Sequence, residues 1–124
     1  MDGRDWGFVA VVVALSLFLS WFFLFFQFGQ IHGSSMYPSL KEGDFIALRS
    51  EGVISVRQGD VIGYSPDPLT PSIAHRVVEV YPGLGYVLVK GDNAATNPWV
   101  DPYPVFASRI VGKVICRFRF PFLG

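Results

Sequence analysis

The sequence has 124 residues, of which 51% are hydrophobic, and ten basic side chains balance ten acidic ones. A neutral chain of this length predicts one modest domain and no general electrostatic attraction to nucleic acid, so we expect no nucleic-acid partner. The single cysteine, Cys116, excludes an internal disulfide, and with only two histidines it makes no convincing metal set, so neither a metal nor another cofactor is expected.

The first predicted element is an apolar helix, because the chain carries no charged residue from Trp6 to Phe26. A helix needs roughly 20 apolar residues to cross the ~30 Å hydrocarbon core of a bilayer. A cleavable signal peptide usually has a shorter apolar centre, about 7–15 residues, followed by a small-residue site that is missing here. We therefore expect residues 1–28 to form an N-terminal tail and a retained transmembrane anchor. A buried core helix is disfavoured because the rest of the chain is too small to surround it.

Residues 29–124 are expected to form one β-rich domain outside the membrane. Short runs of β-forming residues alternate with Gly, Pro, Asn and Asp turn signals, and no segment shows a long helical period. The predicted fold class is mostly β, a small antiparallel domain behind one transmembrane helix. The candidate strands are Phe45–Leu48, Asp60–Tyr64, His75–Tyr81, Tyr86–Lys90 and Ile110–Phe118.

The end of the chain combines aromatic and basic side chains. The stretch Arg117–Leu123 suits either an edge strand or the surface of a bilayer, and it is too short to span the membrane again. Cys116 lies just before it, in an apolar candidate strand, and is expected to be a small buried residue.

The segment around Ser35 is the first candidate for chemistry. Pro38 restricts Tyr37 to an extended conformation, and Gly33 allows the backbone an unusual turn. A serine held in so tight a segment suits a nucleophile. Most Gly-Ser-Ser segments are ordinary loops, however, so the segment alone does not assign a function.

A histidine and two aspartates are the other candidates. His75 begins a candidate strand, and an imidazole can act as a general base near neutral pH. Asp92 and Asp101 follow in turn-like segments, and either carboxylate could orient the imidazole through its second nitrogen. Each residue also has an ordinary interpretation, since histidines are often partly exposed structural residues and aspartates in turns bond their own backbone.

Four short motifs, in this order behind one apolar run, resemble the boxes of the type I signal peptidase family. The resemblance extends from the apolar run to about residue 114, and a histidine where the usual bacterial enzymes have lysine resembles the Ser–His subtype of archaea and the endoplasmic reticulum. The motifs are Ser35-Met36-Tyr37-Pro38 for the nucleophile, Gly59-Asp60-Val61-Ile62 for a strand, His75-Arg76-Val77-Val78 for the base and Gly91-Asp92-Asn93 for the late box.

The resemblance implies a membrane-bound serine endopeptidase that removes signal peptides from exported pre-proteins, cutting after small residues of the Ala-x-Ala kind. Ser35 would be the nucleophile and His75 the base. Gly33 stands where the family often has a serine, so backbone N–H groups would hold the oxyanion. The usual position of the acid, six residues after Asp92, is a proline, and this leaves Asp101 or Asp92 itself as the partner of His75.

The resemblance also implies partners and a location. The substrate would bind extended, as a strand added to a sheet edge, along Gln30, Ile31, His32, Gly33, Ser34 and Met36. The partners would be pre-proteins and the lipid bilayer, with the secretion translocon left open, and the catalytic domain would face the extracytoplasmic side of the cell membrane on a single-pass anchor. Two alternatives stay open: a non-catalytic membrane-tethered β-module that binds exported proteins, and a peptidase dedicated to a special precursor.

Overall fold

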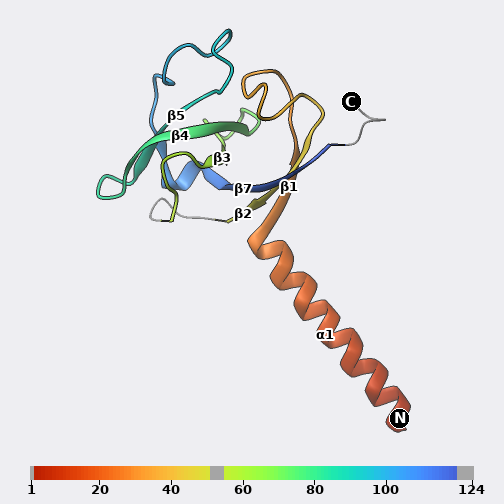
Figure 1. Ribbon diagram of the computed structural model, residues 1–124. Coiled ribbons are helices and arrows are strands. Elements are labelled where there is room, and N and C mark those ends of the chain that lie inside the picture. The colour runs from red at the N-terminus through yellow and green to blue at the C-terminus, as the bar shows by residue number, and fades with distance from the viewer. Residues whose placement is uncertain (1, 51–54, 120–124) are drawn as a thin grey trace.

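A computed structural model describes residues 2–50 and 55–119, and it consists of a long N-terminal helix that projects from a β-domain (Figure 1). Helix α1 spans Gly3–Phe25. A capping box closes its start: the Asp2 carboxylate accepts the backbone N–H groups of Arg4 and Asp5, and the Asp5 carboxylate accepts the N–H of Asp2. This reciprocal pair satisfies backbone donors that the first helical turn leaves without a partner.

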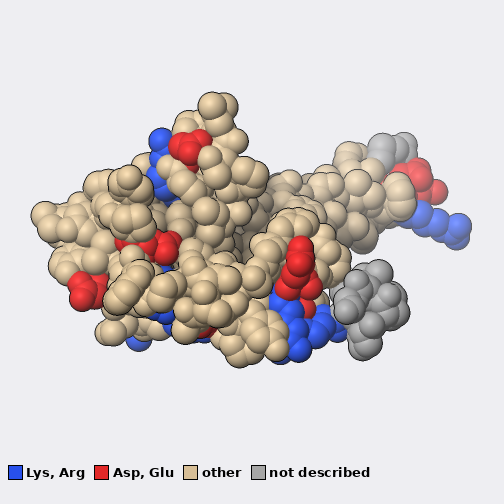
Figure 2. All heavy atoms as spheres, turned by 90° about the horizontal axis from the view of Figure 1, so that it is seen from above, with Lys and Arg blue, Asp and Glu red and all other residues tan. Residues whose placement is uncertain are grey.

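Helix α1 is long and apolar enough to cross a membrane. Its 23 residues extend roughly 34 Å at about 1.5 Å per residue, and none of them is buried against the domain. Figure 2 shows charged side chains at the N-terminal end of the helix and none along its visible length. In the described part of the chain, the helix contacts the domain only near its C-terminal end, where the Phe22 ring stacks on Phe28 of β1, and the rest of its apolar surface is exposed.

The domain is a single seven-stranded antiparallel sheet that curves into a half-barrel, which confirms the predicted fold class. The strand order is β1-β2-β7-β3-β4-β5-β6, so the last strand lies inside the sheet, between β2 and β3. A short 3-10 turn, η1 (Ala107–Arg109), precedes β7. The strands are β1 (Phe26–Gln30), β2 (Phe45–Arg49), β3 (Val61–Tyr64), β4 (Ile73–Tyr81), β5 (Tyr86–Lys90), β6 (Val105–Phe106) and β7 (Ile110–Phe118).

Strand β1 is the main departure from the expected elements. The helix ends at Phe25, three residues before the expected end of the anchor segment, and the chain continues at once as a strand. Phe26 pairs with Arg49 and Phe28 with Ala47 on β2. Phenylalanine suits a helix, a membrane and a strand equally, so the pairing with β2, rather than local composition, determines where the helix stops.

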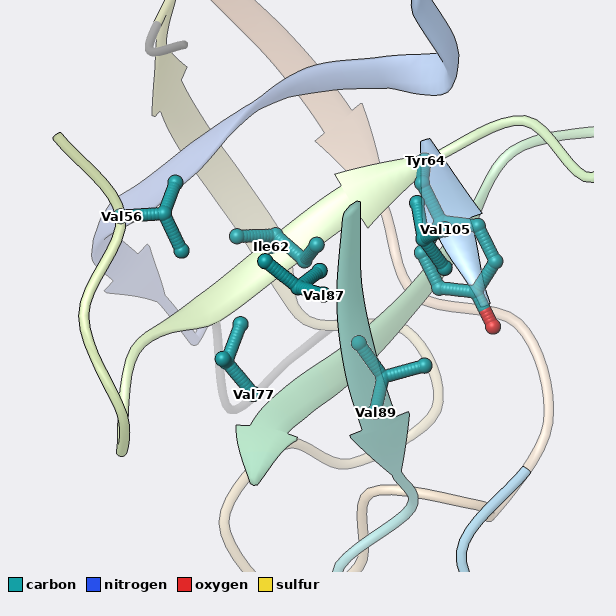
Figure 3. Close-up of a cluster of buried hydrophobic side chains, with 7 residues drawn as sticks. All are labelled: Val56, Ile62, Tyr64, Val77, Val87, Val89 and Val105. Atoms are coloured by element: carbon teal, nitrogen blue, oxygen red, sulfur yellow. The ribbon is translucent and has the colours of Figure 1, made fainter. Parts of the chain in front are cut away.

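Two clusters of buried side chains form the core. The first comes from strands β3 to β6 and the segment before β3 (Figure 3), and it contains Val56, Ile62, Tyr64, Val77, Val87, Val89 and Val105. The second lies beneath the loop that joins β1 to β2 and contains Ile31, Met36, Leu40, Ile46 and Leu48. Met36 is only 2% exposed, so the residue after Ser35 fixes that loop to the sheet.

Cys116 is exposed, so the expectation that it is buried is wrong. Strand β3 pairs with β7 only at Ile110–Lys113, and the later half of β7 pairs with β2 alone, across a register shift. An apolar run indicated burial, but this half of the strand lies at the margin of the core. The tail after Arg119 lies outside the described residues.

Candidate active site

Ser35 lies in the turn-rich loop between β1 and β2, and two backbone carbonyls of this loop are tied to a distant segment. The carbonyl oxygen of Ser35 accepts the backbone N–H of Asn93 at 2.9 Å. The carbonyl oxygen of Ser34 accepts the side-chain amide of Asn93, also at 2.9 Å. Gly33 has a φ of 86°, in the left-handed region that glycine adopts without strain. The Ser35 side chain is thereby presented by a fixed backbone.

His75 lies on β4 opposite Ile62 of β3, and it is 6% exposed. Its Nε2 atom is 3.2 Å from the Oγ atom of Ser35. The two residues are 40 positions apart in the sequence, and the fold brings them into hydrogen-bonding distance.

Asp101 lies in the loop after β5, and its Oδ2 atom is 2.6 Å from Nδ1 of His75. The backbone N–H of Asp101 donates to the carbonyl of Val89 at 2.9 Å. An ionised carboxylate can only accept hydrogen bonds, so Nδ1 must carry the imidazole proton. The unprotonated Nε2 then faces the Ser35 hydroxyl as an acceptor, which is the orientation that a base needs.

Asp92, the other aspartate considered as a partner of His75, contacts Arg76 instead. Its two oxygens accept from the Nε and Nη2 atoms of Arg76 at 2.9 and 2.7 Å, and Oδ2 also accepts the Ser39 hydroxyl at 2.6 Å. The hydrogen bonds from Arg76 hold the pKa of the Asp92 carboxyl below its usual range. Asp92 therefore links Ser39, in the loop between β1 and β2, to Arg76 of β4. Asp101 is the carboxylate that contacts the imidazole.

Tyr64 of β3 also reaches this group, and sequence reasoning missed it. Its hydroxyl lies 3.1 Å from Oδ2 of Asp101 and 3.4 Å from Nδ1 of His75. Burial, and secondly the Asp101 charge, raises the pKa of the Tyr64 phenol. A tyrosine at the end of a strand carries no motif signal, because its contact depends on the register between strands.

A groove with a volume of about 600 Å³ runs beside Ser35 and His75. It is lined by residues 27–32 of β1 and the adjoining loop and by residues 70–75 leading into β4. Of the residues expected to contact substrate, four line the groove and two, Gly33 and Ser34, do not. The four are Gln30, Ile31, His32 and Met36. In the described part of the chain, no three His, Cys, Asp or Glu residues gather as a metal site.

A hydroxyl, an imidazole and a carboxylate joined in series form the arrangement by which serine hydrolases activate a nucleophile. The family model for signal peptidase, peptidase S26, matches residues 2–94, and the chain belongs to this family. The resemblance noted in the sequence is therefore confirmed at the level of the family. The match includes Ser35 and His75 and ends before Asp101. No curated protein matches the chain.

Proposed function

We propose that this protein is a signal peptidase of the Ser–His type that removes signal peptides from exported pre-proteins, cutting after small residues. The observation that carries the proposal is the contact of 3.2 Å between Ser35 Oγ and His75 Nε2, with the Asp101 carboxylate on the opposite nitrogen. Membership of the signal peptidase family supports the substrate class.

In the proposed reaction His75 is the general base and then the general acid. It accepts the Ser35 proton as the hydroxyl oxygen attacks the scissile carbonyl, and it returns that proton to the leaving amine. Asp101 stabilises the imidazolium that forms in between. The protonated amine leaves with the mature protein as the acyl-enzyme forms on Ser35. A water molecule that gives its proton to the same imidazole then hydrolyses the ester, which frees the signal peptide and restores the Ser35 hydroxyl.

The oxyanion would be held by the backbone rather than by a side-chain hydroxyl. Gly33 offers no side chain, and a Cβ atom added to it would meet nothing within 4 Å. The backbone N–H of Ser35 donates to no acceptor in the described part of the chain, so it is available to the tetrahedral intermediate. One such donor contributes about 3 kcal/mol to lowering the barrier.

The substrate is proposed to bind as an extended strand along β1. Among the strands of the described residues, β1 lies at one end of the sheet and pairs only with β2, so its outer edge has no partner strand there and can accept another strand. The groove is lined by β1 and by the segment leading into β4, together with residues of β2, β3 and β7, and Ser35 is part of its lining. Ile31, Met36 and Leu48 contribute apolar side chains to its lining, which suits the small apolar residues of an Ala-x-Ala sequence.

The helix would hold the groove near the bilayer, where a membrane-inserted leader emerges. Helix α1 ends at Phe25 and the groove lining starts at Gln27, two residues later (Figure 1). The expected boundary between residues 28 and 29 falls inside β1, because Phe26 and Phe28 already pair with β2. We propose that helix α1 is the anchor and that the extracytoplasmic peptidase domain begins with β1.

The test uses the full-length protein in detergent micelles with a pre-protein that carries an Ala-x-Ala sequence. The wild type should produce a new N-terminus after that sequence, and Ser35→Ala and His75→Ala should lose this cleavage. Ser108→Ala, which removes an exposed hydroxyl on η1, is the matched control and should cleave normally. Undiminished cleavage by either active-site variant would refute the assignment, and binding without cleavage by the wild type would favour a tethered binding module.

A further inference from the structure

The carboxylate beside His75 comes from a loop, so something must hold its side chain in place. The Asp101 backbone is held by its hydrogen bond to the Val89 carbonyl. Its side chain is 20% exposed, and it borders a second cavity of about 420 Å³ on the side away from the imidazole. A carboxylate that borders solvent can turn toward it unless another donor fixes it.

The Tyr64 hydroxyl is that donor. It contacts Oδ2, the same oxygen that accepts the Nδ1–H of His75. The Tyr64 ring is 6% exposed and packs in the first core cluster, with its hydroxyl at the margin of the cluster (Figure 3). The ring also meets the imidazole edge-on, with centroids 6.1 Å apart. A donor on a buried ring of a central strand has little freedom to move.

We propose that Tyr64 is a positioning residue that holds the Asp101 carboxylate against Nδ1 of His75 and thereby maintains the imidazole tautomer that serves Ser35. The catalytic consequence of this inference rests on the proposed function, whereas the contact between Tyr64 and Asp101 does not depend on it.

Tyr64, rather than one of the charged side chains nearby, is the residue that can position the Asp101 carboxylate. The titratable side chains in contact with the His75 imidazole are Asp101 and Tyr64. Asp67 and Arg109 line the far cavity, but the Asp67 carboxylate is occupied by Thr70 and by the backbone N–H of Leu69. Because burial raises the pKa of the Tyr64 phenol, its hydroxyl keeps its proton and can only donate to the carboxylate.

The test compares Tyr64→Phe with the wild type, since this change removes one oxygen and keeps the ring in the core. Nitrogen-15 NMR of the imidazoles reports which ring nitrogen carries the proton, and the chain has only two histidines. The wild type should show His75 protonated at Nδ1, and Tyr64→Phe should show a mixture of tautomers at the same pH. We expect kcat to fall about tenfold with KM within about twofold, because the hydrogen bond lost is to a charged group.

Two further variants make the outcome specific. Tyr103→Phe removes an exposed hydroxyl that lines the same far cavity and should leave the tautomer and kcat unchanged. In an Asp101→Asn background, adding Tyr64→Phe should change kcat little further, because the acceptor is already lost. Circular dichroism at the assay temperature establishes that each variant is folded.

A Tyr64→Phe variant that keeps the Nδ1–H tautomer overturns the inference, whatever its activity. The proposed function fails separately, through cleavage that survives in Ser35→Ala. The tautomer measurement needs no substrate, so it still decides the role of Tyr64 in that case.

Discussion

At the scale of single residues, the position of the Ser35 side chain depends on close contact between two loops. A Cβ atom on Gly91 would lie 2.6 Å from the Ser35 carbonyl oxygen and 2.7 Å from the side chain of Asn97. Real Cβ atoms do not approach other atoms so closely, so a Cβ atom added at Gly91 would force the backbone of one of the two loops to move. The late Gly-Asp-Asn segment thus contacts the loop that carries Ser35 through its backbone as well as through Asn93.

Gly91→Ala should therefore displace the loop that carries Ser35, the proposed nucleophile. We expect cleavage to fall by about two orders of magnitude, since a displacement of about 1 Å at a reacting group has that effect. Gly83→Ala is the control, because a Cβ atom there meets nothing within 4 Å and should leave the rate of cleavage unchanged. Equal rates for the two variants would contradict the close-contact account.

Of the two aspartates near the site, we expect Asp101 to have a chemical role and Asp92 a structural one. Asp101→Asn leaves the imidazole without its acceptor, and we expect kcat to fall by up to about 10⁴-fold with little change in the melting temperature. Asp92→Asn weakens the bidentate pair with Arg76, and because both side chains are partly exposed we expect a loss of only about 1 kcal/mol of stability.

Thermal unfolding and single-turnover cleavage, measured on both variants, distinguish these roles. A larger loss of kcat in Asp92→Asn than in Asp101→Asn would reverse the assignment.

At the scale of elements, the sequence predicts much of the sheet. Each strand expected between Phe45 and Phe118 lies within two residues of an observed one, because β-rich runs bounded by turn residues are a local signal. Strands β1 and β6 were not expected. Strand β1 continues an aromatic run, and it is recognised as a strand only because it pairs with β2. Strand β6 has only two residues, and its pairing with β5 defines it.

The site could be predicted only in part, for a similar reason. Short motifs in order led to Ser35 and His75, which the fold brings together. They left Asp92 and Asp101 as alternatives, because the position of a loop carboxylate depends on how the loop folds back, which no strand pattern encodes. Tyr64 was missed because its contact depends on the register between β3 and β4. Ile62 is the residue opposite His75, and Tyr64 lies two residues further along β3, so only this register brings the Tyr64 hydroxyl near His75 and Asp101.

The position of β7 between β2 and β3 in the sheet leads to a prediction about stability. Gly112 pairs with Gly63, and a Cβ atom on Gly112 would lie 2.7 Å from the carbonyl oxygen of Arg49. A Cβ atom on Gly63 would meet the Cδ2 atom of Leu48 at 2.6 Å. Gly112→Ala should cost about 2–3 kcal/mol and Gly63→Ala about 1 kcal/mol, because backbone yields less easily than the end of a side chain.

Urea unfolding of the two variants measures the difference. The reverse order of stabilities would show that Leu48, rather than the backbone of β2, limits the space at this crossing.

At the scale of the whole molecule, an ion pair ties the last described residues to the start of β2. The Nε and Nη2 atoms of Arg119 donate to the two oxygens of Asp44 at 2.8 Å each. Asp44 also accepts the backbone N–H of Lys41. Asp44 is 2% exposed, and the hydrogen bonds from Arg119 lower the pKa of its carboxyl to about 2.

This pair predicts how stability depends on pH. A carboxyl whose pKa is lower in the folded state than in the unfolded chain stabilises the fold above its unfolded pKa of about 3.8, and this contribution is lost as the pH falls toward about 2. Denaturant midpoints should therefore fall more steeply between about pH 4 and about pH 2 for the wild type than for Asp44→Asn. Parallel curves for the two proteins would contradict the role of the pair.

We propose that His75 acts as a base for the side chain at position 35, and replacing Ser35 with cysteine tests this role. In a Cys116→Ser background, which removes the exposed native thiol, Ser35→Cys should form a thiolate–imidazolium pair that iodoacetamide alkylates rapidly near about pH 6, because a histidine partner lowers the pKa of a cysteine by several units. Adding His75→Ala should return the onset of alkylation to about pH 8.5, the range of an ordinary thiol. Identical pH profiles with and without the imidazole would contradict the proposed role of His75.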